Sequence, residues 1–221
     1  MTATSNSGAQ TITSTSTSAV TVTATSTSGP QTIITGSGAD SVTAHAAAGT
    51  NNTITTNAGN DTIVAGLGTD LITAGLGADV MTGGGGADTF EFGANGSVIG
   101  ASMDILTDFN TAGADVLNFG ATASVLAADA SALVAGSNVQ TSAGGLVTFH
   151  ASDNSLALKT AAVQADAELD TAGTVAMFVD GANTYVYYAG TATGNADAQL
   201  IQLTGIATLM TITGGSTTVI A

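Results

Sequence analysis

Residues 64–92 read VAGLGTDLITAGLGADVMTGGGGADTFEF, and an aspartate returns in this stretch every nine residues. The aspartates are Asp70, Asp79 and Asp88, with Asp61 one period upstream. A glycine stands two places before each of them, and an apolar residue stands two places after. A period of nine matches neither a heptad nor a helical face, whereas it suits a short strand followed by a tight turn.

The apolar residues of this pattern recur well beyond the quoted stretch. They keep the nine-residue spacing back to Ile54, and the spacing loosens towards the N-terminus. Such units predict an all-β fold, a right-handed parallel β-roll (a β-helix or solenoid) with two units per turn and a C-terminal β-rich cap. The residues expected to point inward are Ile12, Val22, Ile33, Val42, Ile54, Ile63, Ile72, Met81 and Phe90.

Stacking the turns brings like charges together. With 18 residues per turn, Asp61 stacks on Asp79 and Asp70 stacks on Asp88, about 4.8 Å apart. Two carboxylates at that distance repel by about 3.5 kcal/mol at an effective dielectric constant of 20. A divalent cation between the turns would reverse the sign, and oxygen ligands from a flexible glycine loop favour Ca²⁺. Asp-Gly turns alone would explain the glycines but not the unbalanced acids.

The charge balance limits the possible partners. The chain of 221 residues has 16 acids against one base, Lys159, and a net charge of −15. We therefore expect no nucleic-acid partner, because no basic patch is available to contact phosphates. The chain has no Cys, which excludes disulfides and thiolate zinc sites. No run of 18 apolar residues occurs, so we expect no membrane insertion.

Three segments follow from these patterns. Residues 1–34 are Ser/Thr-rich and are either degenerate turns of the roll or a linker, residues 35–92 form the calcium-binding roll, and residues 93–221 form the β-rich C-terminal region. In this last segment 121–136 and 160–170 have the composition of short helices. The sequence also predicts a hairpin at Asp180-Gly181 and strands within 145–150, 155–159, 174–179, 184–189, 198–204 and 209–213.

The repeats resemble the RTX nonapeptide array, G-G-x-G-x-D-x-(apolar)-x. GGGGADTFE matches in full, TGSGADSVT at 35–43 is a further match, and Asn52 replaces the acid in one unit. MDILTDFNTAGADVLNF at 103–119 and NTYVYYAGTATGNADAQLIQLTGI at 183–206 are similar to the segments that follow the array in RTX proteins. The resemblance implies several Ca²⁺ ions, with the following candidate ligands or ligand loops: Asp40, Asn52, Gly59, Asp61, Gly66, Gly68, Asp70, Gly75, Gly77, Asp79, Gly84, Gly86, Asp88, Asp104, Asp108 and Asp115. The last three align with acids that cap the roll or bind a last ion.

The resemblance also implies export through a type I secretion apparatus, with the signal in the C-terminal region, and folding only in extracellular calcium. The composition and the acid excess look like those of RTX-type bacterial surface-layer proteins. We thus expect a secreted, calcium-binding structural protein that forms a homo-oligomer or two-dimensional lattice at the cell surface, where a polysaccharide is a further possible partner. The alternative is a non-catalytic secretion and folding module of an enzyme or adhesin.

No catalytic pattern stands out in the sequence. There is no HExxH, G-x-S-x-G or P-loop motif, and the two Glu residues lie far apart. His45 and His150 are expected to be surface or strand residues. We therefore expect no enzyme activity.

Overall fold

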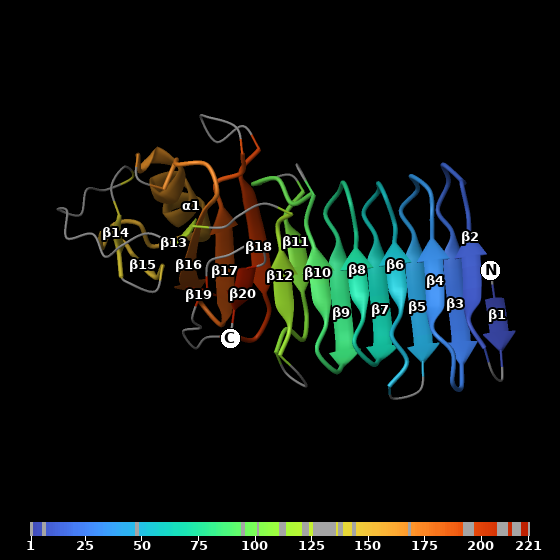
Figure 1. Cartoon of the computed structure of the whole chain (residues 1–221). Coiled ribbons are helices and arrows are strands. Elements are labelled where there is room, and N and C mark those ends of the chain that lie inside the picture. The colour runs from blue at the N-terminus through green and yellow to red at the C-terminus, as the bar shows by residue number, and fades with distance from the viewer. Residues whose placement is uncertain are drawn as a thin grey trace.

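The computed structural model describes residues 2–5, 8–46, 49–93, 96–100, 102–110, 114–120, 124–125, 136, 139–142, 145–167, 169–191, 197–206, 212–213 and 218–220. Its strands are stacked side by side along a rod, and a β-rich C-terminal region with one helix continues the rod at one end (Figure 1). The fold is nearly all β, as the nine-residue period predicts.

The first twelve strands alternate between two parallel sheets. One sheet contains β1 (Thr2–Ser5), β3 (Thr21–Ser26), β5 (Ser41–Ala46), β7 (Thr62–Leu67), β9 (Val80–Gly85) and β11 (Asp104–Leu106). The other contains β2 (Gln10–Thr13), β4 (Gln31–Ile34), β6 (Thr53–Thr55), β8 (Leu71–Thr73), β10 (Thr89–Glu91) and β12 (Val116–Asn118). Because the chain visits the two sheets in turn, each strand pairs with the strand two places away in sequence, which makes a β-solenoid.

The register of the strands follows the sequence period. In the repeat region Ile63 pairs with Met81 and Ile54 pairs with Ile72, a spacing of 18 residues. The residues predicted to point inward form two buried rows, and all of them belong to one hydrophobic core. The sequence prediction of two nine-residue units per turn is therefore confirmed.

The C-terminal region extends both sheets. In the sheet of β1 the order continues from β11 through β18 (Gln199–Leu203), β17 (Asn183–Tyr188) and β16 (Thr174–Asp180) to β13 (Ser124–Val125). In the sheet of β2 it continues from β12 through β20 (Thr218–Ile220) to β19 (Ile212–Thr213). A separate pair consists of β14 (Gln140–Thr141) and β15 (Val147–Thr148). Parallel pairing with β11 and antiparallel pairing with β17 make β18 the junction between roll and cap.

Strand β17 is buried on both faces. Val186 and Tyr188 pack into the core of the solenoid, whereas Tyr185 and Tyr187 pack into a second core on the opposite face. The Tyr188 ring stacks on Phe119, with ring centroids 4.5 Å apart. The predicted hairpin at Asp180-Gly181 is present as the β16–β17 pair. A strand covered on both faces explains why this segment is so rich in large apolar side chains.

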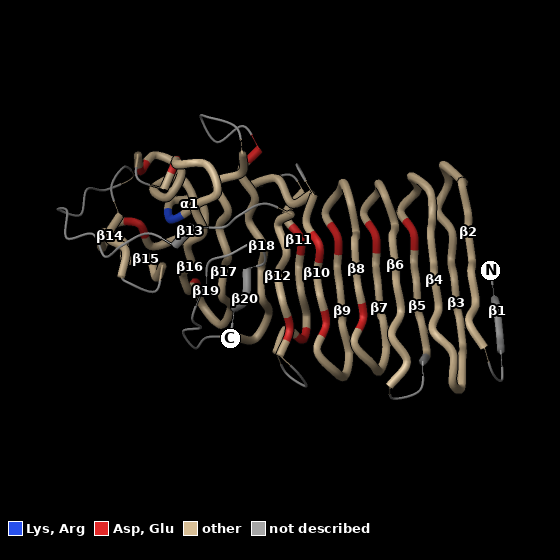
Figure 2. The backbone as a smooth tube through the Cα atoms, viewed as in Figure 1, with Lys and Arg blue, Asp and Glu red and all other residues tan. Residues whose placement is uncertain are grey.

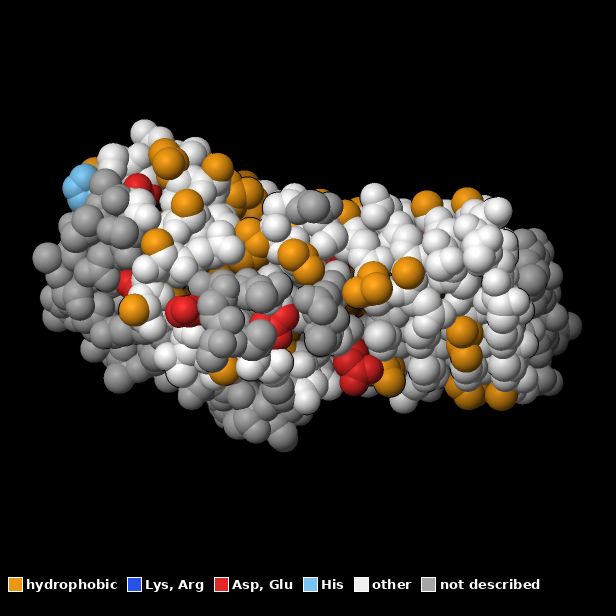
Figure 3. Space-filling view, turned by 90° about the horizontal axis from the view of Figure 1, so that it is seen from above, with side chains coloured by type: hydrophobic (Ala, Val, Ile, Leu, Met, Phe, Trp, Pro, Cys, Tyr) orange, Lys and Arg blue, Asp and Glu red, His pale blue; other side chains and the backbone are white. Residues whose placement is uncertain are grey.

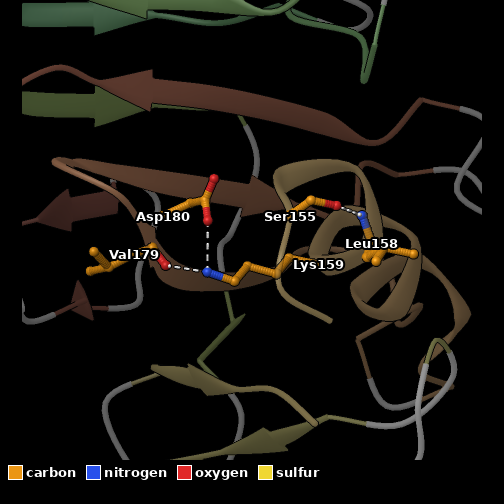
Figure 4. Close-up of polar contacts among 5 residues, drawn as sticks. All are labelled: Ser155, Leu158, Lys159, Val179 and Asp180. Atoms are coloured by element: carbon orange, nitrogen blue, oxygen red, sulfur yellow. Dashed lines mark hydrogen bonds and ion pairs between the residues drawn. The ribbon is translucent and has the colours of Figure 1, made fainter. Parts of the chain in front are cut away.

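The only helix among the described residues is α1 (Leu156–Ala165), and it corrects one sequence prediction. Residues 155–159 were expected to form a strand, but Ser155 accepts a hydrogen bond from the Leu158 N–H and caps the helix instead. Lys159 then donates to the Asp180 carboxylate at 2.8 Å and to the Val179 carbonyl at 3.0 Å (Figure 4). The predicted helix at 160–170 begins earlier and ends at Ala165, whereas the one at 121–136 lies largely outside the described residues.

The glycine loops determine how closely the turns stack. A Cβ on Gly77, whose φ is +139°, would lie 1.8 Å from the carbonyl oxygen of Gly59 in the preceding turn. The same contact recurs between Gly86 and Gly68, again at 1.8 Å. No side chain fits between these turns, so glycine is required both for its conformation and for the close approach.

Gly77→Ala should therefore destabilise the fold by about 3 kcal/mol or more, since it combines a strained conformation with overpacking against backbone. The matched control is Gly93→Ala, because a Cβ there would meet nothing within 4 Å. Thermal unfolding followed by circular dichroism checks the difference. Equal midpoints for the two variants would contradict this account of the loops.

Candidate metal centre

The acids of the repeats form two rows, one along each edge of the solenoid (Figure 2). Each row lies in the glycine loops that connect a strand of one sheet to the next strand in the other sheet. The loops before β5, β7 and β9 and the start of β11 carry Asp40, Asp61, Asp79 and Asp104, and the loops before β6, β8, β10 and β12 carry Asn52, Asp70, Asp88 and Asp115. The structure thus separates the acids into two columns, as alternating units require.

Each column is tied together by one repeated hydrogen bond. The Asp79 Oδ1 accepts from the backbone N–H of Asp61 at 2.8 Å, and the Asp61 Oδ1 accepts from that of Asp40 at 2.7 Å. In the other column the Asp88 Oδ1 accepts from the Asp70 N–H at 2.8 Å. Each of these acids therefore caps the backbone of the residue stacked on it in the preceding turn, which is Val20 for Asp40 and Asn52 for Asp70, through a charge-assisted bond that fixes the carboxylate between turns.

The second carboxylate oxygen has no such partner. The Oδ2 atoms of Asp40, Asp61, Asp70 and Asp79 are buried and accept no hydrogen bond from protein. These side chains are at most 2% exposed. A buried carboxylate oxygen without a partner is costly, and calcium is the kind of hard cation that carboxylate oxygens bind. The residues present therefore fit a divalent cation held between successive turns.

The surface of the solenoid agrees with this burial. Over the solenoid, most of the face shown in Figure 3 consists of backbone and of side chains that are neither hydrophobic, charged nor histidine, and few acidic side chains appear there. The charge of the repeats is thus directed inward, towards the loops, rather than into solvent.

Side chains alone would not complete a coordination shell here. Within the described part of the chain, no group of three or more His, Cys, Asp or Glu side chains could hold a metal ion. The remaining ligands would have to be backbone carbonyls, and the loops contain them: the oxygens of Thr50, Gly59 and Gly68 lie close against the glycine stacked on each. Ca²⁺ accepts six to eight oxygens in flexible geometry, including backbone carbonyls.

The glycines named from the sequence share one property, a positive φ. It ranges from 102° at Gly75 to 139° at Gly77. The other members of this set are Gly59, Gly66, Gly68, Gly84 and Gly86. The sequence predicts this left-handed conformation from the glycines.

The last three acids end the two columns. Asp104 accepts from the Asp79 N–H and Asp115 from the Asp88 N–H, and Asp108 accepts from the N–H groups of Gly83 and Gly84 through both oxygens. Asp108 therefore caps the last glycine loop through backbone donors. Asn52 takes the place of an acid within a column, and its Oδ1 accepts from the Gln31 N–H at 3.1 Å.

Burial shifts the acidity of the stacked acids. Removal from water raises the pKa of Asp70 to about 7 and those of Asp79 and Asp88 to about 6, although backbone hydrogen bonds oppose the shift. Burial likewise raises the pKa of Asp104 to about 9. The same cause raises the pKa values of Asp61 and Asp115. Without a cation the fold thus favours the protonated acids.

The comparisons with known proteins agree with the repeat pattern. Residues 47–81 and 64–96 match the family model of the RTX calcium-binding nonapeptide repeat (4 copies), which covers the centre of the solenoid. No curated protein and no solved structure matches the chain. The chain thus carries RTX repeats, and these imply that it binds calcium.

Sequence reasoning located the two columns but missed their internal bonding. In that bonding one oxygen of each acid caps the preceding turn, which the spacing of the acids does not indicate. Asn52 was the indication of this bonding in the sequence. An amide has an acceptor oxygen but no charge, so an Asn in the column indicates that hydrogen-bond acceptance matters at this position as well as charge. The two histidines are not part of either column: His45 lies on β5, and the His150 Nδ1 bonds the Ser152 Oγ at 2.8 Å.

Asp79→Asn should separate the two roles of the side chain. The amide keeps an acceptor for the Asp61 N–H but loses the buried charge, so the calcium-free fold should become more stable. Calcium affinity should fall at least about tenfold, or about 1.4 kcal/mol. Melting in EDTA and calorimetric calcium titration measure the two effects, and Asp180→Asn on the surface hairpin is a control for calcium affinity. Unchanged affinity would remove Asp79 from the ligands.

The pH dependence should run in opposite directions with and without calcium. A pKa raised above its unfolded value near 3.8 contributes stability that is fully present below about pH 4 and lost as pH rises through the folded pKa. The calcium-free fold should therefore lose stability between about pH 5 and 8. Calcium affinity should rise over the same range, since the cation displaces protons. Denaturant titrations at several pH values test this, and a calcium-free stability that increases towards pH 8 would contradict it.

Proposed function

We propose that this chain is a secreted, calcium-binding structural protein that folds on Ca²⁺ outside the cell and self-assembles as part of a bacterial surface layer. The single observation that carries the calcium step is the set of buried, unpartnered Oδ2 oxygens in the stacked acids. We assign the role of ligand to these acids, with the carbonyls of the glycine loops completing each shell. Asp104, Asp108 and Asp115 close the columns.

The physical basis for calcium-dependent folding is the absence of any other counter-charge. The only Lys or Arg in the chain, Lys159, pairs with Asp180 in the C-terminal region, away from the columns. Without a cation, folding must bury unpaired carboxylates or protonate them, and both cost free energy. Binding of Ca²⁺ to the folded state alone would shift the equilibrium by mass action. Extracellular calcium, which is millimolar, suits weaker glycine-loop sites.

A structural role is supported by what surrounds the columns. The described part of the chain is a rod of regular strands that continues into the C-terminal region. No helix in it is long and apolar enough to cross a membrane. The large acid excess keeps separate copies apart unless cations lie between them. Export through a type I apparatus and contact with a surface polysaccharide belong to the same proposal and rest on the resemblance of the repeats to RTX proteins.

One observation favours the alternative, a secretion and folding module. Strands β18 and β20 pair directly with β11 and β12, so a roll that folds on calcium would template the C-terminal region. Such a module would bind calcium equally well but remain monomeric. Self-association is thus the property that distinguishes the two functions.

Electron microscopy and light scattering of the full chain with millimolar calcium chloride or EDTA test the proposal. We expect ordered assemblies or oligomers with calcium and unfolded monomers with EDTA. Magnesium chloride at the same concentration is the control, because its stricter octahedral geometry fits these loops poorly. Folded monomers at all calcium concentrations would exclude surface-layer assembly and leave the folding module.

A further inference from the structure

The longer of the two sheets is covered on its outward face, the face away from the solenoid core, along only part of its length. In the C-terminal region, Val163 of α1 belongs to the second core together with Phe178 of β16 and Leu200 of β18. Over β3, β5, β7 and β9, the outward residues alternate with buried ones and are partly or fully exposed. Among the described residues, the layer that contains α1 thus stops where the solenoid begins, and the sheet continues without a cover.

The uncovered part of this face has no acidic or basic side chain. Strands β3, β5, β7 and β9 contain no Asp, Glu, Lys or Arg. Asp40, Asp61 and Asp79, which directly precede three of them, share the inward side of the sheet with the core residues and are at most 2% exposed. In a chain with a net charge of −15, another acidic molecule can approach this surface without meeting an acid. Its two central rows of side chains are Thr21, Ser41, Thr62 and Val80, and Thr23, Thr43, Val64 and Thr82.

The outward face of the other sheet is less suited to a contact. Its strands β4, β6, β8 and β10 have three or four residues each, whereas β3, β5, β7 and β9 have six. It also carries Glu91, whose carboxylate accepts from the Thr73 hydroxyl at 3.1 Å and from the Asn118 amide at 3.3 Å. A contact between copies over this face would bury that charge in both of them, which is unfavourable.

A second copy of this chain matches the uncovered face in spacing and in chemistry. The rows of side chains repeat about every 4.8 Å along the rod, and two sheets pack when their side chains interdigitate. Each Thr or Ser hydroxyl can both donate and accept a hydrogen bond, so a face rich in hydroxyls is complementary to its own copy. A cationic partner would find no acid on this face. Nucleic acid and anionic lipid would be repelled by the net charge of the chain.

The layer that contains α1 determines how two copies can face each other. It lies on the same face as the uncovered strands, so copies with parallel rods would bring their two α1 layers into collision. A two-fold axis parallel to the strands makes the rods antiparallel and places the two layers at opposite ends of the contact. Strands β3, β5, β7, β9 and β11 then cover about 500 Å² per copy, since five strand spacings span about 24 Å and six residues about 20 Å. The total of about 1,000 Å² is near the lower limit for a specific interface.

We propose that two copies of this chain pack face to face through the outward surface of β3, β5, β7 and β9, with their rods antiparallel. The second copy continues, over the same sheet, the layer that α1 begins. This inference rests on the proposed function, for which it supplies one contact between the subunits of the layer. Calcium acts on the contact indirectly, by keeping the strands of the face folded.

Thr43→Glu tests the contact at its centre, because Thr43 lies on β5 between Thr23 and Val64. The new carboxylate would be buried in the contact without a partner. Sedimentation velocity in millimolar calcium should show the 21.2 kDa wild-type chain as a dimer, and the dissociation constant of Thr43→Glu should be at least roughly tenfold higher. The matched control is Thr55→Glu, a partly exposed threonine on interior strand β6 of the other sheet, which should dimerise like wild type.

A distance between labels tests the geometry without a charge in the contact, and it applies even where Thr43→Glu fails to fold. Since the chain has no Cys, Thr55→Cys places a single spin label on the outward face of the other sheet. In a face-to-face dimer the two labels lie at least about 30 Å apart, because three intersheet spacings of about 10 Å separate them. A shorter distance, or a dimer that a folded Thr43→Glu variant leaves unchanged, would overturn the contact.

Three further outcomes separate this contact from the proposed function and from another occupant. Circular dichroism of the same samples with calcium or EDTA reports calcium-dependent folding by itself. Ordered assemblies that Thr43→Glu still forms in electron microscopy would overturn the face-to-face contact and keep the proposed function. A monomeric wild type that cosediments with cellulose, a neutral polysaccharide, while Thr43→Glu does not, would overturn the dimer and assign the face to a glycan.

Discussion

The structure depends on the burial of aspartates between stacked turns without any basic partner. Each acid of the two columns caps the backbone of the preceding turn through one oxygen, and in Asp40, Asp61, Asp70 and Asp79 the other oxygen is buried and has no hydrogen-bond partner. The first interaction fixes the register of the rod, and the second makes that register unfavourable at neutral pH unless a cation is present. Under the proposed ligand assignment, structural order and metal binding are properties of the same side chain, which explains why the repeat can be so short.

The glycines and the small core residues allow the turns to stack closely enough for this arrangement. Backbones of successive turns approach so closely that a methyl group on Gly77 or Gly86 would overlap the turn below. The inward rows are aliphatic through most of the rod and become aromatic at Phe90, where the solenoid meets its wider C-terminal region. A second core forms only in the C-terminal region, on the opposite face of β16, β17 and β18.

Most of the solenoid could be predicted from the sequence because its rules are local and repeated. The apolar rows follow from counting residues between Ile12 and Phe90, and the 18-residue turn and the two columns of acids follow from the strict nine-residue spacing after Ile54. The C-terminal region was harder, because its interactions join distant segments. Residues 155–159 alternate like a strand, yet the Ser155 cap and the contact of Lys159 with Asp180 favour a helix. The different contacts of Oδ1, which caps the preceding turn, and of Oδ2 likewise depend on three-dimensional geometry and cannot be predicted from the spacing of the residues.

Asn52 has a consequence for how such a rod changes over evolutionary time. Its amide oxygen caps the turn before it as an acid would, so the column continues without a charge at that level. Aspartate and asparagine codons differ by a single base. Point mutations between the two residues can therefore change the number of charged positions in a column one turn at a time. The capping hydrogen bonds, and with them the fold, are kept at each step.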